Sequence, residues 1–357
     1  MFRDKTKVAL RDLLEQAGND GALRIIRESL SEKKIRPEDF SLREIWEACE
    51  QGRSVMEAVS SDMFPKITGE LINSKIIDAY NITATIGDML VTTVPSKMEV
   101  ETVAGFDAVE SPEEVQQGRE YEDSTVGEKY VTIRNQKFGR LLSVTEEMIY
   151  FDKTGQILAR GARIGEKAAL YKEKLIVEGV QDVNSNVFNP SGVAAAFYRT
   201  AASGTLRINS VAATPFGESG MKAFEKVQQN MTDENGDPVL LNPANTYVLV
   251  PVDLWVEARQ LARTVKVPEG NENADNVFKG TFTPLTSYYI SAQSTTVWYA
   301  GDFRQDFWWS EVWPLQVMTA KPGHEAEFRR DVKSIHKVRF YGAIGAVSSS
   351  HAFKFTG

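Results

Sequence analysis

Histidine and cysteine are the side chains that most often bind metals or carry out nucleophilic chemistry, and this chain of 357 residues contains few of them. They are His324, His336, His351 and Cys49. His324-Glu325 begins like the His-Glu-x-x-His helix that binds zinc, but Phe328 stands where the second histidine is required. We interpret the histidines as surface or hydrogen-bonded side chains and Cys49 as a buried or idle thiol, and we expect no metal site.

Other chemical motifs are incomplete. Gly217-Glu218-Ser219-Gly220 lacks the last glycine of a nucleophile elbow, because Met221 follows it. No glycine-rich phosphate loop is present. The acidic turn that begins at Asp233 resembles a calcium loop, but Pro238 and Ala244 replace the glycine and the glutamate that such a loop needs. The sequence therefore predicts no catalytic residue, no cofactor and no enzyme activity.

Charge is distributed very unevenly along the chain. Residues 99–128 hold ten acids and one base, whereas residues 129–174 hold ten Lys or Arg against five acids. Residues 321–357 also have more bases than acids. A long loop without a core of its own is usually functional or disordered. Two interpretations of the acidic stretch 97–128 therefore stay open: a disordered surface loop, or an extended loop laid over a neighbouring copy.

If the loop contacts a second copy, two sets of charged side chains would meet. The acidic set is Glu110, Glu113, Glu114, Glu120, Glu122 and Asp123. The basic set is Lys129, Arg134, Lys137, Arg140, Arg160, Arg163 and Lys167. The basic part of residues 321–357 is a second candidate partner for acidic surfaces.

Composition excludes several classes of protein. Hydrophobic content of 42% and charged content of 25% are ordinary for a globular protein, and the length predicts two compact parts. No apolar run is long enough to span a membrane, and the start has no signal-peptide core. A single cysteine forms no intrachain disulfide, which favours a reducing compartment. A net charge of −8 argues against a general nucleic-acid binder.

A strand followed by a long helix would position the basic side chains. Residues 130–142 alternate and are rich in β-branched and aromatic residues, which predicts a strand. Ser143 and Glu146 have the spacing of a capping box. An apolar stripe then predicts one amphipathic helix at about residues 155–180. Its members are Ile157, Gly161, Ile164, Ala168, Tyr171 and Leu175.

Other elements are predicted from shorter patterns. Residues 1–60 are helical by pattern, either as an assembly arm or as a cap on the same subunit. Strands are predicted at 82–86, 89–94, 246–250, 288–291 and 297–300, and helices at 216–231 and 251–263. The aromatic residues between Phe303 and Trp313 are interpreted as core rather than as a ligand-stacking site.

The order of these features resembles the major capsid protein of tailed bacteriophages, with its HK97-like head fold. The resemblance rests on the acidic loop, on Phe138-Gly139-Arg140-Leu141-Leu142-Ser143 returning from it, and on the long helix. The stretch from Val248 to Trp255 and Gly301-Asp302-Phe303 also resemble the family. It implies an α+β fold with a long spine helix, an extended β-hairpin loop, a peripheral domain and an axial domain.

The resemblance also implies a domain division. An N-terminal helical arm would cover 1–62, and the extended loop 97–128. The peripheral domain would comprise 63–96, 129–185 and 312–345, and the axial domain 186–311 and 346–357. The family further implies a loop at the capsomer axis, with Lys266, Glu269, Asn271, Glu272 and Asn273.

The function implied by the resemblance is structural. Copies of the chain would form hexamers and pentamers of an icosahedral phage head around double-stranded DNA, assembled in the host cytoplasm. Portal and scaffolding proteins would be partners, a decoration protein could be another, DNA would contact the inner face non-specifically, and no membrane would be involved. An encapsulin-like nanocompartment shell stays open as the alternative, and an oligomeric enzyme or a tail or adaptor component is a third.

Overall fold

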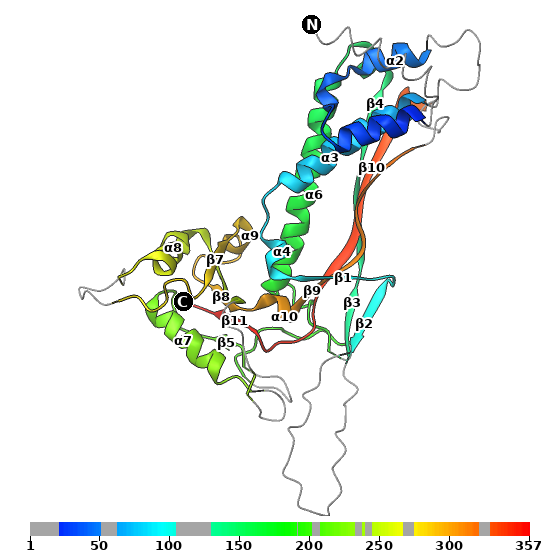
Figure 1. The fold of residues 1–357 in the computed structure, drawn as a ribbon. Helices are drawn as coiled ribbons and strands as arrows, with labels where there is room; N and C mark the ends of the chain where they lie inside the picture. The colour runs from blue at the N-terminus through cyan, green and yellow to red at the C-terminus, as the bar shows by residue number, and fades with distance from the viewer. Residues whose placement is uncertain are drawn as a thin grey trace, which may run out of the picture. The chain divides into compact units, whose positions relative to one another are not determined.

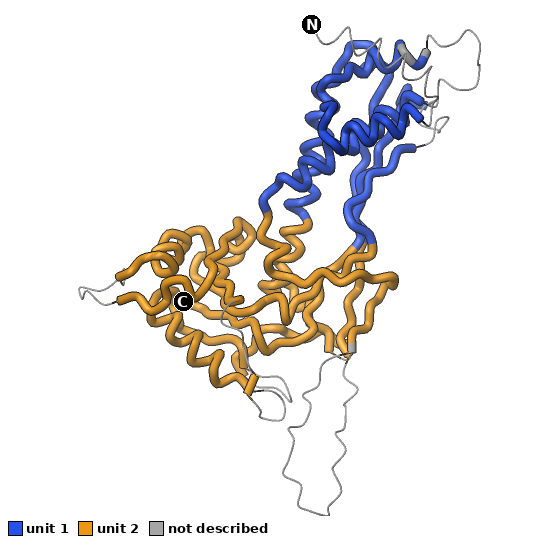
Figure 2. The backbone as a smooth tube through the Cα atoms, in the orientation of Figure 1, with its two compact units in different colours: residues 1–84, 137–171, 313–341 blue, residues 85–136, 172–312, 342–357 orange. Residues whose placement is uncertain are grey.

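The computed structural model describes residues 21–50, 63–104, 130–190, 192–201, 208–232, 238–239, 245–266, 275–320 and 329–357. The chain divides into two compact units (Figure 2). Unit 1 comprises residues 1–84, 137–171 and 313–341, and unit 2 comprises the remainder. Helix α6 (Thr154–Val180), strand β9 (Phe307–Thr319) and strand β10 (Val332–Ala346) each begin in one unit and end in the other (Figure 1).

Unit 1 is built from helices that pack on one another and on strands. Residues 21–31 are helical, and η1 (Pro37–Asp39), α2 (Leu42–Glu50), α3 (Met63–Ile82) and α5 (Glu146–Tyr150) follow along the chain. Ile26 and Leu30 of the first helix and Ile45 of α2 belong to the core of this unit. Residues 21–50 therefore contribute to the core of unit 1, and the role of residues 1–60 as an assembly arm or as a cap stays a prediction.

Helices α3 and α6 approach each other closely at glycines. A Cβ added at Gly165 of α6 would lie 2.3 Å from the carbonyl oxygen of Ile76 in α3, closer than any contact that atoms tolerate. At Gly161, one turn earlier, the nearest atoms are side-chain carbons at 3.6 and 3.7 Å. Glycine at position 165 thus sets how near the two helices come, and Ile72 and Ile76 fill the contact.

A four-stranded sheet has the order β1-β9-β10-β4, where β1 is Thr92–Pro95 and β4 is Gln136–Thr145. Among the described strands, β4 therefore has one neighbour, β10, and forms an edge of the sheet. In β10 the residues from Val332 to Phe340 alternate between buried and less buried positions, as expected of a strand with one covered face. Leu142 and Val144 of β4 and Val338 of β10 reach the core of unit 1.

Unit 2 contains a five-stranded sheet of order β5-β11-β8-β6-β7. Its strands are β5 (Ser210–Val211), β6 (Tyr247–Val250), β7 (Thr283–Thr286), β8 (Trp298–Gly301) and β11 (Ala352–Phe355). Helices α7 (Glu218–Gln229) and α8 (Trp255–Arg263) supply Phe224 and Leu261 to the same core as Trp298 and Phe355. A separate ribbon pairs β2 (Val100–Ala104) with β3 (Tyr130–Arg134).

Four local predictions meet the structure directly. The helix expected at about 155–180 is present as α6. The strand expected at 82–86 is wrong, because α3 continues to Ile82 and α4 (Gly87–Leu90) follows. The strand expected at 288–291 is also wrong, because this stretch is helix α9 (Tyr288–Ser291). The capping box at Ser143 is wrong as well, since β4 runs on to Thr145 and α5 begins one residue later.

The aromatic residues between 303 and 313 belong mainly to the interior, as expected. Phe303, Phe307 and Trp309 of unit 2 are at most 1% exposed. Trp313, in unit 1, instead lies under the guanidinium of Arg339. The division into peripheral and axial domains follows other boundaries than the two units and stays a prediction.

Candidate functional site

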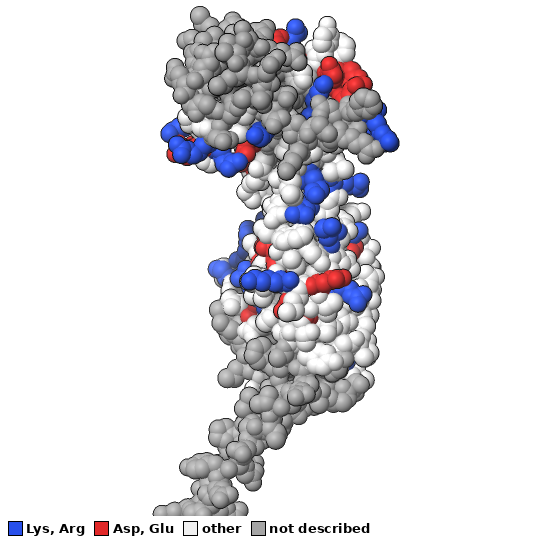
Figure 3. Space-filling view, turned by 90° about the vertical axis from the view of Figure 1, so that its right-hand side faces the viewer, with Lys and Arg blue, Asp and Glu red and all other residues white. Residues whose placement is uncertain are grey.

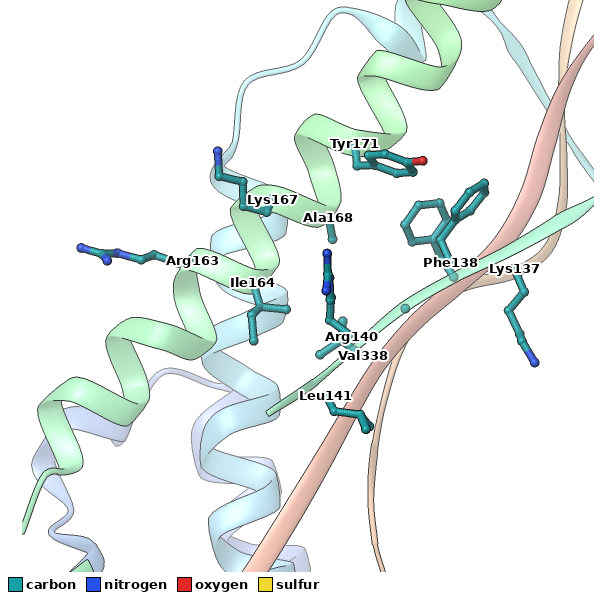
Figure 4. A pocket seen from close by; sticks show the side chains of 12 residues that line it. Lys137, Phe138, Arg140, Leu141, Arg163, Ile164, Lys167, Ala168, Tyr171 and Val338 are labelled. Atoms are coloured by element: carbon teal, nitrogen blue, oxygen red, sulfur yellow. The ribbon is translucent and has the colours of Figure 1, made fainter. Parts of the chain in front are cut away.

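A cavity of about 780 Å³ lies in unit 1 between the edge strand β4, helix α6 and strand β10 (Figure 4). Residues 137–141 of β4 form one wall, and α6 forms the other with residues from Arg163 to Tyr171. Val338 and Phe340 of β10 complete the lining. The apolar stripe of α6 is wider than the surface that α3 covers. Gly161 and Gly165 face α3. The cavity lies beside the uncovered part of the stripe, which Ile164, Ala168 and Tyr171 form.

The floor of the cavity is aromatic. The ring of Phe138 lies 5.2 Å from the ring of Tyr171, edge to face, and 5.2 Å from that of Phe340. Such ring pairs stabilise a packed cluster beyond the area that they bury. Tyr171 is nevertheless 42% exposed and Leu141 is 64% exposed, so the cluster leaves apolar surface uncovered.

Cations surround this apolar floor. Arg140 of β4 and Arg163 and Lys167 of α6 line the cavity, and all three are exposed. Figure 4 shows Arg140 between β4 and α6, Arg163 and Lys167 extending from the side of α6 away from β4, and Lys137 pointing to the other side of β4. Lys and Arg side chains are also exposed on the face that Figure 3 shows. No acidic side chain of the described residues lines the cavity, so its field favours an anionic ligand.

A second hollow, of about 600 Å³, lies along the same strand. It shares residues 137–141 of β4 with the first cavity and adds Lys337 and Arg339 of β10. The guanidinium carbon of Arg339 lies 4.2 Å from the ring centroid of Trp313, and its Nη2 donates a hydrogen bond to Gln316 Oε1 at 3.2 Å. These contacts hold the arginine in one orientation, which reduces the entropy lost when it binds an anion.

The structure brings together four of the basic residues singled out from the sequence: Lys137, Arg140, Arg163 and Lys167. Arg160 is exposed on α6 but does not line the cavity, and Arg134 is exposed on β3 in unit 2. Lys266 pairs with Asp275, with 2.8 Å between Nζ and Oδ1. The other predicted contact residues lie outside the described residues: Lys129, Glu110, Glu113, Glu114, Glu120, Glu122, Asp123, Glu269, Asn271, Glu272 and Asn273.

Sequence reasoning missed Lys337, Arg339 and the aromatic floor as parts of one site. The excess of bases in residues 321–357 was a signal for the two cations, since they stand two residues apart in a strand and so share a face. The meeting of Phe138 with Tyr171 and Phe340 had no such local signal. It depends on how the sheet packs against α6.

The described histidines are held by hydrogen bonds. His336 is fully buried in unit 1, where its Nδ1 and Nε2 lie 3.1 Å from Thr319 Oγ1 and Ser334 Oγ. Burial lowers the pKa of His336 to about 4, so the ring is neutral at pH 7. His324 lies outside the described residues.

In unit 2, His351 Nδ1 lies 2.9 Å from Asp306 Oδ1. The fully buried Asp306 also accepts hydrogen bonds from the backbone N–H groups of His351 and Ala352. Burial opposes the charged form of His351, but the hydrogen bond and charge of Asp306, with Asp302 nearby, outweigh it and raise the pKa of His351. These hydrogen bonds hold the start of β11 against Asp306.

The described part of the chain contains neither a metal-binding cluster nor a membrane-spanning helix. No group of three His, Cys, Asp or Glu side chains in the described part of the chain could hold a metal ion. Within the same residues, no helix combines the length and the apolarity needed to cross a membrane. Cys49 is buried, and burial raises its pKa to about 12, so the thiolate is absent at neutral pH.

Comparison with known proteins points in one direction. The family described as phage capsid protein matches residues 128–352. The capsid of a native GTA particle is 13% identical, with a TM-score of 0.51 over 77% of this chain and 90% of that one. The mature capsid of bacteriophage PhiM1 is 11% identical, with a TM-score of 0.49 over 76% and 87%. A virus-like particle from Pyrococcus furiosus is 7% identical, with a TM-score of 0.46 over 80% and 98%.

No curated protein matches the sequence. The likeness to the native GTA capsid concerns the fold, and it confirms the expected α+β class and the HK97-like architecture with its long helix.

Proposed function

The chain belongs to the phage capsid protein family, and on that premise we propose that it is the subunit of an icosahedral phage head that encloses double-stranded DNA. Its role is structural rather than catalytic. Copies would form hexamers and pentamers, and the protein would reside in the virion after assembly in the host cytoplasm. The observation that supports a specific assembly contact is the cavity with a basic rim and an aromatic floor beside β4.

The contact would be head to tail. The acidic residues within 110–123 of one copy would lie against Lys137, Arg140, Arg163 and Lys167 of the next. Each copy then uses two different surfaces, its acidic segment toward one neighbour and its basic residues toward another. Repetition of such a contact produces a ring when the rotation closes, which suits a capsomer.

Small energies suffice for this arrangement. An exposed ion pair contributes about 0–1 kcal/mol, and burial of apolar surface adds about 25 cal/mol per Å² removed from water. The exposed part of Tyr171 and Leu141 supplies such surface. Because each copy in a closed shell makes the contact, modest terms add up over the lattice.

Charge reversal tests the contact. The triple change Arg140→Glu, Arg163→Glu and Lys167→Glu is expected to abolish shells in electron micrographs and to leave soluble, folded subunits in sedimentation and circular dichroism. The control is Lys222→Glu with Lys226→Glu on α7 of unit 2, which reverses two charges outside the cavity and should form normal shells.

A compensating change sharpens the result. Adding Glu120→Lys, Glu122→Lys and Asp123→Lys to the triple variant restores the attraction with both signs exchanged, so shells should reappear in part. Normal shells from the triple variant alone would refute the proposed contact. The failure of the unaltered protein to form shells under any condition would refute the proposed function itself.

The content of purified particles tests the enclosure of DNA. Nuclease-protected double-stranded DNA is the expected content of heads from infected cells, whereas a protein cargo without nucleic acid would support the nanocompartment alternative. The remaining assignments follow the family premise: a portal, a scaffolding protein and a decoration protein as partners, and residues 266–273 at the capsomer axis.

A further inference from the structure

The side chain of Arg199 in unit 2 ends in a buried charge that the described residues do not satisfy. Its terminal nitrogens Nη1 and Nη2 are buried, and neither donates a hydrogen bond to a described group. The guanidinium carbon lies 5.1 Å from the ring centroid of Phe188, so an aromatic face covers the group without offering it an oxygen acceptor. Burial lowers the pKa of Arg199. A buried cation of this kind is costly unless an acceptor meets it.

Backbone hydrogen bonds fix Arg199 beside strands β5 and β11. The carbonyl oxygen of Arg199 accepts hydrogen bonds from the N–H groups of Asn209 and Ser210 at 3.1 and 3.0 Å. The N–H group of Arg199 donates to Asn209 Oδ1 at 2.8 Å. Strand β11 is tied to the same residue, because the N–H group of Lys354 donates to the carbonyl oxygen of Asn209 at 2.9 Å. Arg199 and Lys354 therefore belong to one hydrogen-bonded framework.

Lys354 brings a second cation to this framework. Its Nζ lies 5.8 Å from the ring centroid of Tyr198 and 6.0 Å from that of Tyr299. Both rings are held in place, since Tyr299 is 4% exposed and the hydroxyl of Tyr198 donates a hydrogen bond to the carbonyl oxygen of Val180 at 2.8 Å. Aromatic faces attract the ammonium group and keep it in this part of unit 2.

The carboxylate of Asp182 supplies a buried acceptor to the same group. Its Oδ2 accepts a hydrogen bond from the N–H group of Phe197 at 2.7 Å, whereas its Oδ1 is buried and accepts none from the described residues. Burial raises the pKa of Asp182, and the charges of Lys354 and Arg199 act in the opposite direction. The unpartnered oxygen and the two unpartnered nitrogens are thus close enough to interact but are not bonded to one another.

Charge adds a further requirement for a ligand. Arg199 and Lys354 against Asp182 leave one positive charge in excess. Asp306 does not compensate it, because its carboxylate is already bonded to His351. A ligand that fits must therefore be an anion, must accept hydrogen bonds from a guanidinium and must donate one to a carboxylate oxygen.

We propose that this group binds inorganic phosphate, with two phosphate oxygens accepting hydrogen bonds from Arg199 and a protonated oxygen donating one to Asp182 Oδ1. A guanidinium presents its N–H groups as a fork that fits two oxygens of one oxyanion. Inorganic phosphate keeps at least one O–H group at neutral pH. Sulfate has none, and a phosphomonoester loses its own above a pKa of about 6. A phosphodiester, as in DNA, also lacks this donor.

The bound anion would join three separate segments of unit 2. Asp182 follows the end of α6, Arg199 precedes β5, and Lys354 belongs to β11. A ligand that binds only the folded arrangement of these segments stabilises it by mass action. The proposal concerns the single subunit and does not depend on the shell function.

Calorimetric titration of unassembled native subunits at pH 7.5 tests the site. Inorganic phosphate should bind saturably, and sulfate at equal ionic strength should bind about tenfold or more weakly, because it leaves the buried Asp182 oxygen without a donor. Free phosphate at about ten times its dissociation constant should also shift the folding equilibrium about tenfold toward the folded state in urea unfolding.

Two variants separate the site from general attraction of anions. Arg199→Met should abolish phosphate binding, whereas the control Arg259→Met removes another arginine of unit 2 that lies over a ring, that of Trp255, but is exposed, and should bind normally. Asp182→Asn replaces the acceptor by an amide that can donate, so sulfate should bind as well as phosphate or better. Asparagine also tolerates the φ of 53° at this position, so the variant should fold.

Three results would overturn the proposal. Native subunits that bind no phosphate saturably would exclude the site. Equal affinities for phosphate and sulfate in both the native protein and Asp182→Asn would show that charge alone attracts the anions. Equal losses of binding in Arg199→Met and Arg259→Met would place the anion elsewhere. Since each measurement uses unassembled subunits, normal shells in a separate assembly experiment would leave the shell function standing in every case.

Discussion

Acid should weaken unit 1 through the buried side chain of His336. Its ring is fully buried, and both nitrogens contact hydroxyl groups, those of Thr319 and Ser334, neither of which can carry a compensating negative charge at pH 5. The folded-state pKa is about 4, below the ordinary value of 6.5. The stabilising effect of a neutral ring is therefore complete above pH 6.5 and is lost as the pH falls toward 4.

The size of the effect follows from these two values. A shift of one pKa unit corresponds to about 1.36 kcal/mol, so the full loss below pH 4 would be about 3 kcal/mol. At pH 5 the unfolded chain is almost fully protonated at this position and the folded chain is mostly neutral, which gives a loss of about 2 kcal/mol. That is a large fraction of the stability of an ordinary domain.

The assay compares urea unfolding at pH 7.5 and pH 5.0 for unassembled subunits of the native protein and of His336→Gln. Glutamine does not titrate, so the variant should lose about 2 kcal/mol less than the native protein over this interval. The comparison uses the pH dependence rather than the absolute stability, because glutamine also changes the packing. An identical pH dependence in the two proteins would refute the assignment of the buried neutral ring.

Two further predictions concern His351 in unit 2 and the glycines of α6 that face α3. The pKa of His351 is raised by Asp306, so the stability that the charged ring contributes is complete below pH 6.5 and is lost as the pH rises through the folded-state value. In urea unfolding between pH 6 and 9, His351→Gln should reduce this loss of stability. An unchanged pH profile would contradict the prediction. Gly165→Ala places a Cβ 2.3 Å from the carbonyl oxygen of Ile76 and should lower the free energy of unfolding by about 1–3 kcal/mol in the same assay. Gly161→Ala meets only ordinary contacts and should leave the stability unchanged or raise it. Equal effects of the two changes would show that the two helices move apart freely.

The long helix could be predicted because its signal is repeated many times. Ile157, Ile164 and Tyr171 stand at helical spacing over several turns, and α6 has the expected bounds to within one residue. The short elements could not be predicted, because a few β-branched residues near Ile82 outweighed the four-residue spacings of Ile67 with Leu71 and of Ile72 with Ile76 upstream. The whole of α3 forms because those residues are buried in unit 1, which is a property of tertiary packing.

The part of the candidate site that could be predicted is the group of basic residues that lie close together in the sequence. Lys137, Arg140, Arg163 and Lys167 were evident because basic residues follow an acidic stretch along the chain. Arg339 became part of the site through its contact with Trp313, which no spacing in the sequence indicates. The place of β4 at the edge of the described sheet was likewise not predictable, since the position of a strand in its sheet depends on partners nearly two hundred residues away, in β10.

The placement of β11 has a consequence for how the chain reaches its native state. This strand, the last described one along the sequence, sits between β5 and β8 rather than at the rim of its sheet. The sheet of unit 2 therefore stays split until a late segment inserts, and pairings between segments distant in sequence form slowly. During that interval two strand borders are bare and prone to aggregate. Slow maturation of each newly made polypeptide would then limit how many subunits are ready to assemble at any moment.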